Sequence, residues 1–355
     1  MLNRNKVAVI STGNGGQSMA AYLSLKGYET TLYAREKERV EMFRNNVFEL
    51  GGKFPGTVTI SMISMDMEAV IRDAALIMVT TPAQYHSIVA RAMAPYLVDG
   101  QSVVLNPGRT FGTCEFENTL ERSGCRAKII LGETDTFLFT CRADAPGHPI
   151  IYEMKQDVGM AAHNPKETPH LVELVSGFFP DVVPAKNVLQ TGMSNIGMIF
   201  HPLPTLMNVT RIERHETYLH YIEGITPSVA AMLEQMDAER VAVAEHVGAR
   251  VLTAKEWVKD RYGSEGATLY ERIQNTEAYR GITAPKTLTT RYFYEDIQTG
   301  CVPVSVLGDH CGIDTPLIDA VISMGSAVCG QDFRKTGRNE SMVERNQVLK
   351  ILQCE

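Results

Sequence analysis

The stretch that decides the fold is V-A-V-I-S-T-G-N-G-G-Q-S, residues 7–18 of a chain of 355. Residues 7–11 form an apolar run that is too short for a helix, which predicts a buried strand. The glycines after it predict a tight turn, and the apolar residues over 19–25 predict a helix that ends at Gly27. Residues 30–33 predict a second strand. The sequence therefore opens with a strand, a glycine turn, a helix and a strand.

This glycine turn follows the pattern G-x-G-x-x-G, except that Ser18 stands at the third glycine position. Gly13 allows the tight turn, and Gly15 lets the backbone approach a pyrophosphate with no side chain in the way. The phosphates would bind to the unpaired N–H groups at the start of the helix. An ordinary glycine turn is the alternative interpretation. We expect a dinucleotide to bind at Gly13, Asn14, Gly15 and Gly16.

The end of the second strand indicates which dinucleotide binds. A carboxylate about 20 residues after the first glycine would accept hydrogen bonds from the ribose of NAD, but residues 33–35 read Tyr-Ala-Arg. Arg35 suits the 2′-phosphate of NADP, so we expect NADP(H) to be preferred, with NAD(H) as the other cofactor. The competing interpretation is that Arg35 only begins a solvated helix whose charges include Glu36.

Composition limits the classes of function. The chain carries 34 Lys and Arg against 41 Asp and Glu, a formal net charge of −7, with no basic block, which argues against nucleic-acid binding. No apolar run approaches the roughly 18 residues of a membrane span, and the first strand begins too early for a signal peptide, so we expect a soluble, cytoplasmic protein. Seven scattered cysteines predict reduced thiols, and the nine histidines show no metal-ligand spacing, so we expect no metal.

Predicted strands and helices alternate through the first half of the chain. This order predicts a doubly wound parallel sheet of the Rossmann type, with helices on both faces. The carboxyl ends of such strands line the ligand crevice, so Thr81 and Pro82 are expected to contact the cofactor. The further strands are expected at 57–63, 76–80, 102–105 and 128–131, and the helices at 67–72, 84–96 and 114–123.

Helix signals dominate the second half of the chain. Thr226-Pro227 and Thr315-Pro316 are each an N-cap followed by proline at the first helical position. Thr253 and Glu256 have the spacing of a capping box. We therefore expect an NAD(P)-binding domain over residues 1–185 and a mostly α-helical substrate domain over residues 186–355.

His201 is the candidate for acid–base chemistry in the second domain. It precedes a proline, which places it near a helix end or a kink, where a lone histidine is more often a core residue. A functional histidine needs a partner that orients its ring, and Asp296 is the candidate. Arg291, in the same run, could bind a substrate carboxylate with two N–H groups. The sequence alone does not bring residues 201 and 296 together.

Two motifs, together with the glycine turn, resemble the octopine/nopaline (opine) dehydrogenase family over nearly the whole chain. They read S-N-I-G-M-I-F-H-P-L-P-T-L-M-N from residue 194 and R-Y-F-Y-E-D-I-Q-T-G-C-V-P-V-S-V-L-G-D-H-C-G-I-D-T-P from residue 291. The resemblance implies reductive condensation: the amine of an amino acid joins a 2-oxo acid, commonly pyruvate, and NAD(P)H reduces the imine to an N-(carboxyalkyl) amino acid. It also implies residue roles. His201 would be the general acid/base, Asp296 would orient it, Arg291 would bind the amino-acid carboxylate, and Asn195 would contact the substrate.

Two other classes of function stay open. A 2- or 3-hydroxy-acid reductase would use the same histidine and aspartate to protonate a carbonyl oxygen, and it would oxidise NADPH without an amine. A non-catalytic dinucleotide-binding module would bind NADP and turn over no oxo acid. The expected partners are small-molecule substrates, without nucleic acid or membrane, and a homodimer is left open. Which amino acid and which 2-oxo acid are used does not follow from the sequence.

Overall fold

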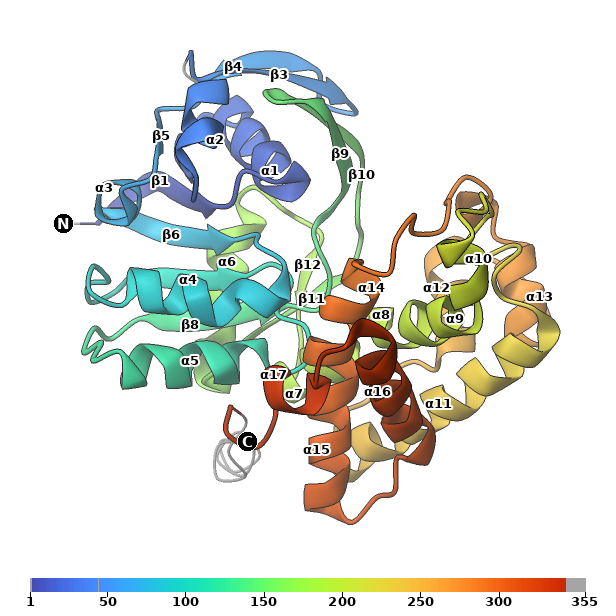
Figure 1. Cartoon of the computed structure of the whole chain (residues 1–355). Coiled ribbons are helices and arrows are strands. Elements are labelled where there is room, and N and C mark those ends of the chain that lie inside the picture. The colour runs from blue at the N-terminus through green and yellow to red at the C-terminus, as the bar shows by residue number, and fades with distance from the viewer. Residues whose placement is uncertain (1, 44, 343–355) are drawn as a thin grey trace. The chain divides into compact units, whose positions relative to one another are not determined.

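A computed structural model describes residues 2–43 and 45–342, which form two compact units (Figure 1). The first unit runs to Thr191 and the second begins at Gly192. The division lies within the short helix α7 (Val188–Met193), a few residues after the expected boundary at 185. The first unit is a Rossmann-like sheet domain and the second is α-helical, which confirms the predicted fold class.

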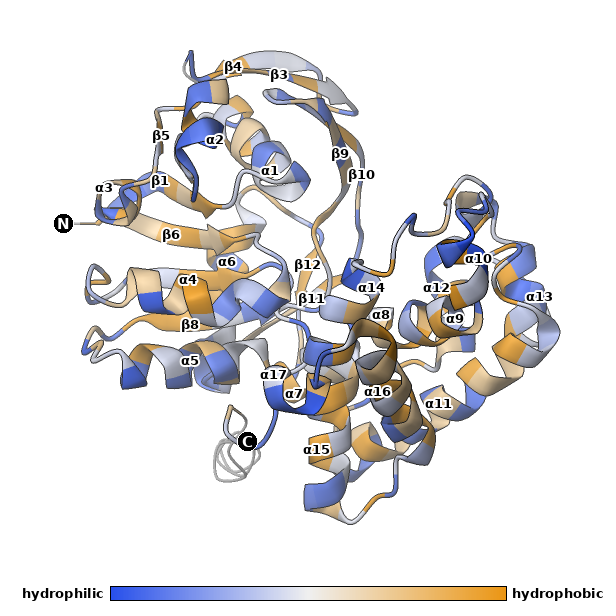
Figure 2. Cartoon of the chain, in the orientation of Figure 1, coloured by the Kyte–Doolittle hydropathy of each residue, from blue (hydrophilic) through white to orange (hydrophobic). Residues whose placement is uncertain are grey.

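An eight-stranded sheet forms the centre of the first unit, in the order β12-β11-β8-β7-β6-β1-β2-β5. The side chains of its interior strand β1 alternate between two cores, because Val7 and Val9 pack in one apolar cluster while Ala8 and Ile10 pack in the other. Both faces are therefore buried, as in parallel sheets. Figure 2 shows the hydrophobic residues along β6 and β8. The strands are β1 (Asn3–Ile10), β2 (Glu29–Tyr33), β5 (Met62–Ser64), β6 (Ala74–Val79), β7 (Ser102–Leu105), β8 (Ile130–Thr134), β11 (Val158–Ala162) and β12 (Val182–Pro184).

Helices cover both faces of this sheet. Residues of α1 and α6 belong to the core cluster of Val7 and Val9, and residues of α3, α4 and α5 belong to that of Ala8 and Ile10. The helix α2 contributes no buried residue, consistent with a solvated surface helix. The bounds are α1 (Asn14–Leu25), α2 (Lys37–Met42), α3 (Met67–Ile71), α4 (His86–Met93), α5 (Gly112–Arg122) and α6 (Thr168–Ser176).

The sheet departs from the expected wholly parallel arrangement at one pair. The strand β11 runs antiparallel to β8, although the other neighbours in this sheet are parallel. The physical reason is the connection, since the hairpin of β9 (Phe139–Ala145) and β10 (His148–Met154) stands where a crossover helix would be needed for parallel pairing.

The expected strand over residues 57–63 is also wrong, because the structure divides it. The strand β4 (Gly56–Thr59) pairs with β3 (Val47–Gly52) in a four-stranded sheet with β10 and β9, whereas β5 pairs with β2. The change of partner occurs between two adjacent residues. Ile60 N donates to Asn46 O and Ser61 N donates to Thr30 O, so the chain passes from one sheet to the other.

The second unit consists of helices whose ends follow the predicted signals in part. Thr226 caps α11 by accepting from Val229 N at 3.4 Å, and Thr253 forms the predicted capping box with Glu256. Thr315 makes no cap bond, since its hydroxyl instead lies 3.5 Å from Asp319 Oδ1. The bounds are α8 (Gly197–Phe200), α9 (Pro202–Met207), α10 (Val209–Glu213), α11 (Pro227–His246), α12 (Ala254–Tyr262), α13 (Leu269–Gln274), α14 (Arg291–Tyr294), η4 (Ile297–Cys301), α15 (Val302–Cys311), α16 (Pro316–Cys329) and α17 (Phe333–Thr336).

Several features are absent from residues 2–43 and 45–342, which the structure describes. No helix there has the length and apolar character to cross a membrane. The same residues contain no group of three or more His, Cys, Asp or Glu side chains that could hold a metal ion. The six cysteines described are free thiols, and Cys354 lies outside the described residues.

Candidate functional site

The glycine turn between β1 and α1 excludes side chains at two positions. A Cβ on Gly16 would lie 1.9 Å from the carbonyl oxygen of Ser11, and a Cβ on Gly15 would lie 2.8 Å from the ring of Phe137. Gly16 therefore allows the helix to start directly against the end of β1. The backbone N–H groups of the first turn have no partner within an α-helix, so they form a site suited to a phosphate group.

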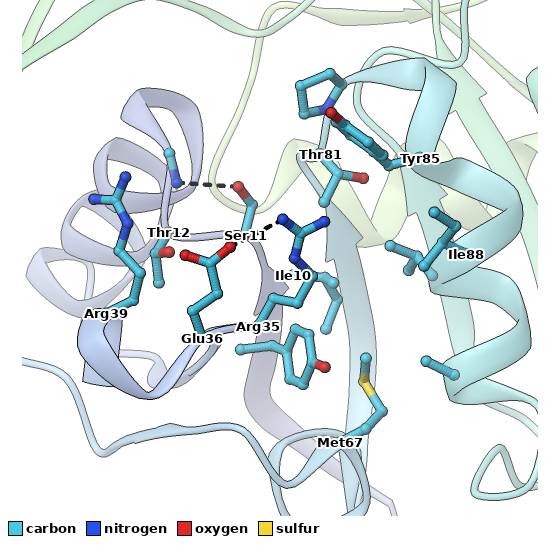
Figure 3. Close-up of a pocket in the computed structure, with 15 residues that line it drawn as sticks. Ile10, Ser11, Thr12, Arg35, Glu36, Arg39, Met67, Thr81, Tyr85 and Ile88 are labelled. Atoms are coloured by element: carbon cyan, nitrogen blue, oxygen red, sulfur yellow. Dashed lines mark hydrogen bonds and ion pairs between the residues drawn. The ribbon is translucent and has the colours of Figure 1, made fainter. Parts of the chain in front are cut away.

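A pocket with a volume of about 270 Å³ lies beside this turn in the first unit (Figure 3). Four of the residues predicted to bind the cofactor line it, whereas Asn14, Gly15 and Gly16 belong to the first turn of α1. Apolar side chains of α3 and α4 form a further part of its wall. This combination of an apolar wall and polar groups suits the nucleoside half of a dinucleotide. The predicted residues in the lining are Gly13, Arg35, Thr81 and Pro82.

The charged residues that line this pocket include Arg35 and Glu36. In Figure 3 the guanidinium of Arg35 points into the pocket, and its Nη2 lies 3.0 Å from Glu36 Oε1. This hydrogen bond raises the pKa of Arg35 above its ordinary value. Arg39 also lines the pocket. The carboxylate of Glu36 was not singled out as a cofactor contact from the sequence, although its place directly after the second strand could have indicated it.

His201 lies where two short helices of the second unit meet. Its N–H donates to Gly197 O at 3.1 Å and closes α8. Pro202 then begins α9, because its ring has no N–H to continue the hydrogen bonds of α8 and suits the first helical position. The expectation that His201 lies near a helix end or a kink is confirmed, because α8 ends and α9 begins at this residue.

The structure brings His201 and Asp296 together across 95 positions of sequence. His201 Nδ1 lies 2.8 Å from Asp296 Oδ2, and the exposed fractions of the two side chains are 20% and 2%. A buried carboxylate at this distance requires Nδ1 to carry the proton. The Nε2 atom is then the basic nitrogen of the ring.

A π-helix places Asp296. Asp296 is the residue before η4, and Cys301 N donates to Asp296 O at 3.0 Å, five residues back, instead of the usual four. This wider turn packs closely against α8. A Cβ on Gly300 would lie 2.7 Å from Met198 Cβ and 3.0 Å from Asn195 Nδ2. Because Gly300 has no side chain, η4 can lie close to α8 and keep Asp296 next to the end of that helix at His201.

Two tyrosines complete the surroundings of His201. Tyr221 Oη lies 3.2 Å from His201 Nε2, and the ring of Tyr292 stacks on the imidazole with 4.1 Å between centroids and 5° between planes. Neither residue was singled out from the sequence. Tyr292 lies within the R-Y-F-Y-E-D motif, which could have indicated it, whereas no local pattern marks Tyr221.

A second histidine, His220, forms a hydrogen bond with the backbone next to His201. His220 Nε2 lies 3.0 Å from Phe200 O, so this nitrogen donates to the carbonyl oxygen of the residue before His201. Burial lowers the pKa of His220 to about 4, and nearby His201 adds to this effect. His220 is therefore neutral at neutral pH.

The two residues implied as substrate contacts have contacts of their own. Arg291 Nε lies 2.5 Å from Glu295 Oε2, and Arg291 Nη2 forms an ion pair with the same carboxylate. Glu295 is buried, whereas the Arg291 side chain is exposed. Asn195 is 1% exposed and lies against Gly300 of the π-helix. The geometry therefore places Arg291 at the surface of the second unit and Asn195 inside it.

Comparison with known proteins adds the family. The α-helical domain of NAD/NADP octopine/nopaline dehydrogenase matches residues 184–329, and the N-terminus of NAD-dependent glycerol-3-phosphate dehydrogenase matches residues 6–107. An opine dehydrogenase of Arthrobacter sp. (strain 1C) is 38% identical over 340 residues, which cover 95% of this chain and 94% of that protein. The chain belongs to the opine dehydrogenase family. It is therefore an NAD(P)-dependent oxidoreductase that acts on a CH–NH bond, and the resemblance noted in the sequence is confirmed.

More distant members of the family share the fold. A D-nopaline dehydrogenase of Agrobacterium vitis is 25% identical over 376 residues, with 95% of this chain and 89% of that protein covered. The solved structure of an octopine dehydrogenase with NADH and L-arginine has a TM-score of 0.82 at 20% identity, covering 99% of this chain and 98% of that one. A yersinopine dehydrogenase with NADP+ bound has a TM-score of 0.76 at 14% identity, covering 99% of both chains. At these identities the two solved structures establish a common fold.

Proposed function

We propose that this opine dehydrogenase condenses the amine of an amino acid with a 2-oxo acid such as pyruvate and reduces the imine to an N-(carboxyalkyl) amino acid. The observation that carries the proposal is the pair of His201 and Asp296 within the α-helical domain of this family. The octopine dehydrogenase of the same fold was solved with NADH and L-arginine and with NADH and pyruvate. The same enzyme would also catalyse the reverse oxidation.

In the proposed mechanism His201 is the group that moves protons. Its Nε2 accepts a proton from the ammonium or carbinolamine nitrogen of the substrate and returns it to the hydroxyl that leaves as water. Asp296 holds the proton on Nδ1 and stabilises the imidazolium that forms. NAD(P)H, when bound, supplies the hydride that reduces the imine carbon. One group that both accepts and donates near neutral pH suffices for these proton transfers.

Arg291 and Asn195 are proposed to bind the substrate, as the family resemblance implies. The exposed guanidinium of Arg291 has N–H groups besides those directed at Glu295, and these can bind the carboxylate of the amino acid. Asn195 is buried against the π-helix, so its contact with a substrate stays a prediction.

The cofactor is NAD(P)(H), and we propose that NADP(H) is preferred while NAD(H) is accepted. Support comes from Arg35, which lines the pocket beside the glycine turn and can bind a 2′-phosphate. Glu36 opposes this preference, because its carboxylate can accept hydrogen bonds from unphosphorylated ribose hydroxyls. The residues present fit the cofactor. A glycine is required at residue 16, where a Cβ would collide with Ser11 O, and this close turn presents the backbone N–H groups at the start of α1 to a phosphate.

A cytoplasmic location is proposed on the ground that the cysteines described are free thiols, as in reducing compartments. Two further expectations stay predictions: that the protein holds no metal ion, and that it can form a homodimer.

The experiment that tests the function is a matrix of amino acids against 2-oxo acids, followed by the loss of NADPH and NADH absorbance. We expect oxidation only when an amino acid and an oxo acid are both present. Oxidation with an oxo acid alone would identify a hydroxy-acid reductase. Saturable NADPH binding with no turnover in any pair would identify a non-catalytic binding module.

A further inference from the structure

The basic nitrogen of His201 is already in contact with a hydroxyl group. Nδ1 of the ring faces Asp296 Oδ2 at 2.8 Å, and Nε2 faces Tyr221 Oη at 3.2 Å. The carboxylate can only accept, so Nδ1 donates to it and Nε2 keeps a lone pair. Tyr221 is therefore the donor in the second contact.

Aromatic packing fixes the direction of the Tyr221 hydroxyl. The ring of Tyr221 stacks on Tyr279 with 4.0 Å between centroids and 8° between planes. His220 packs against the same ring edge-on, at 4.9 Å and 89°. The residue is 7% exposed. A planar ring held by these contacts cannot turn its hydroxyl away from His201 without moving its neighbours.

The Tyr221 hydroxyl also keeps its proton. Burial raises the pKa of Tyr221 well above its ordinary value, and Tyr292, Tyr262 and Asp296 add smaller effects in the same direction. The group is therefore a neutral donor throughout the pH range in which a histidine titrates.

We propose that Tyr221 is a positioning residue of the acid–base reaction, which holds His201 in its neutral form by donating its O–H to the lone pair on Nε2 until a substrate displaces it. This inference rests on the proposed function of His201. The O–H donated to Nε2 stabilises the neutral ring, because the protonated ring has no lone pair there to accept it. Asp296 acts in the opposite direction, since its carboxylate stabilises the imidazolium.

Tyr221 and Asp296 are the groups that shift His201 between its neutral and its protonated form, whereas Tyr292 and His220 make other contacts with the ring. The ring of Tyr292 stacks on the face of the imidazole. His220 has a ring centroid 6.2 Å from that of His201 and stays neutral, because burial lowers its pKa to about 4. Loss of the Tyr221 hydroxyl should therefore raise the pH at which His201 takes up a proton.

The test is Tyr221→Phe, which keeps the ring in its stack and removes only the hydroxyl. We expect the acidic limb of the pH profile of kcat/KM to move upward by about half to one pH unit, the effect of one lost hydrogen bond. The matched control is Tyr279→Phe, which removes a hydroxyl from the other ring of the same stack and leaves the contact with His201 in place. Its acidic limb should coincide with that of the wild-type enzyme.

Titration of the His201 ring by NMR on histidine-labelled protein gives a readout that needs no turnover. The resonance is assigned by its absence in His201→Ala. A raised His201 pKa in Tyr221→Phe, but not in Tyr279→Phe, supports the proposal even if the amine-dependent reaction is not found. An unchanged pKa in Tyr221→Phe, or equal shifts in both variants, overturns it. A loss of kcat by about 10²-fold or more at every pH, without a shift of the limb, also overturns it, because it would assign a proton relay to Tyr221.

Discussion

At His201 each ring nitrogen has one partner within the second unit, so the protein sets the tautomer of the ring and solvent does not. Asp296 accepts from Nδ1, Tyr221 donates to Nε2, and Tyr292 covers one face of the ring. A base prepared in this way loses little free energy to reorientation when a substrate binds.

His201 and Asp296 should behave as one unit. We expect His201→Ala to lower kcat by about 10²–10⁴-fold with little change in the Kd of NADPH. Asp296→Asn should also lower kcat, because its amide would donate to Nδ1 and select the wrong tautomer. The factor should be smaller, because the imidazole stays in place. The double variant should be little worse than His201→Ala. His246→Ala, at an exposed position in the last turn of α11, is the matched control. Losses that multiply in the double variant would contradict a shared role.

Arg35 should carry the preference for NADPH. We expect Arg35→Ala to raise the KM for NADPH by about tenfold, the effect of losing one charge-assisted contact with a phosphate, and to change the KM for NADH little. Lys37→Ala is the control, because Lys37 is exposed two positions after Arg35 but does not line the pocket. Equal effects on both cofactors would show that Arg35 does not contact the 2′-phosphate. A wild-type enzyme with a higher kcat/KM for NADH than for NADPH would reject the preference altogether.

Among the elements, the π-helix η4 has the most direct effect on the site. It follows α14 and Asp296, and it packs on α8, the helix that His201 ends. The extra residue in its turn directs Asp296 toward the imidazole, in keeping with the frequent occurrence of π-helical turns at functional sites. The close contact depends on Gly300.

Gly300→Ala should damage both stability and catalysis. The new methyl group would lie 2.7 Å from Met198 Cβ, so α8 or η4 must shift, at a cost of about 1–3 kcal/mol in the free energy of unfolding. We expect a lower Tm together with a lower kcat. Gly281→Ala is the matched control, since no atom lies within 4 Å of its new Cβ. A Gly300→Ala enzyme with the wild-type Tm and kcat would mean that the π-helix does not determine the position of Asp296.

At the scale of the whole molecule, the two units can be followed separately. The single tryptophan of the chain, Trp257, lies in the second unit, where its ring is 6.0 Å from that of Phe200. Its fluorescence therefore reports the unfolding of the unit that contains His201 and His220. A chain of two units need not unfold in one step, so a probe of one unit is the appropriate measurement.

Acid should destabilise the second unit through His220. The pKa of His220 falls from 6.5 in the unfolded chain to about 4 in the structure because the ring is buried. Above 6.5 both states are neutral and no free energy is lost. As the pH falls toward 4 only the unfolded chain binds the proton, which lowers the free energy of unfolding by about 2 kcal/mol at about pH 5.

Urea unfolding followed by Trp257 fluorescence at about pH 7.5 and about pH 5 measures this effect. His220→Gln keeps a donor for Phe200 O but has no titrating ring. The free energy of unfolding of the wild type should therefore exceed that of this variant by less at the lower pH. An equal difference in the free energy of unfolding at both pH values would show that His220 does not titrate in this way.

Local sequence determined the fold class, the glycine turn, the helix end at His201-Pro202 and the capping box at Thr253, because each depends on residues within a few positions of one another. The resemblance of two motifs also indicated the family. The antiparallel β11 and the division between β4 and β5 could not be predicted, since they depend on which strand edge a segment meets. The resemblance paired Asp296 with His201, but only the tertiary structure shows their contact and the contact of Tyr221 with the same ring. Their contacts join residues on separate helices, and packing, which no periodicity in the sequence encodes, decides where those helices meet.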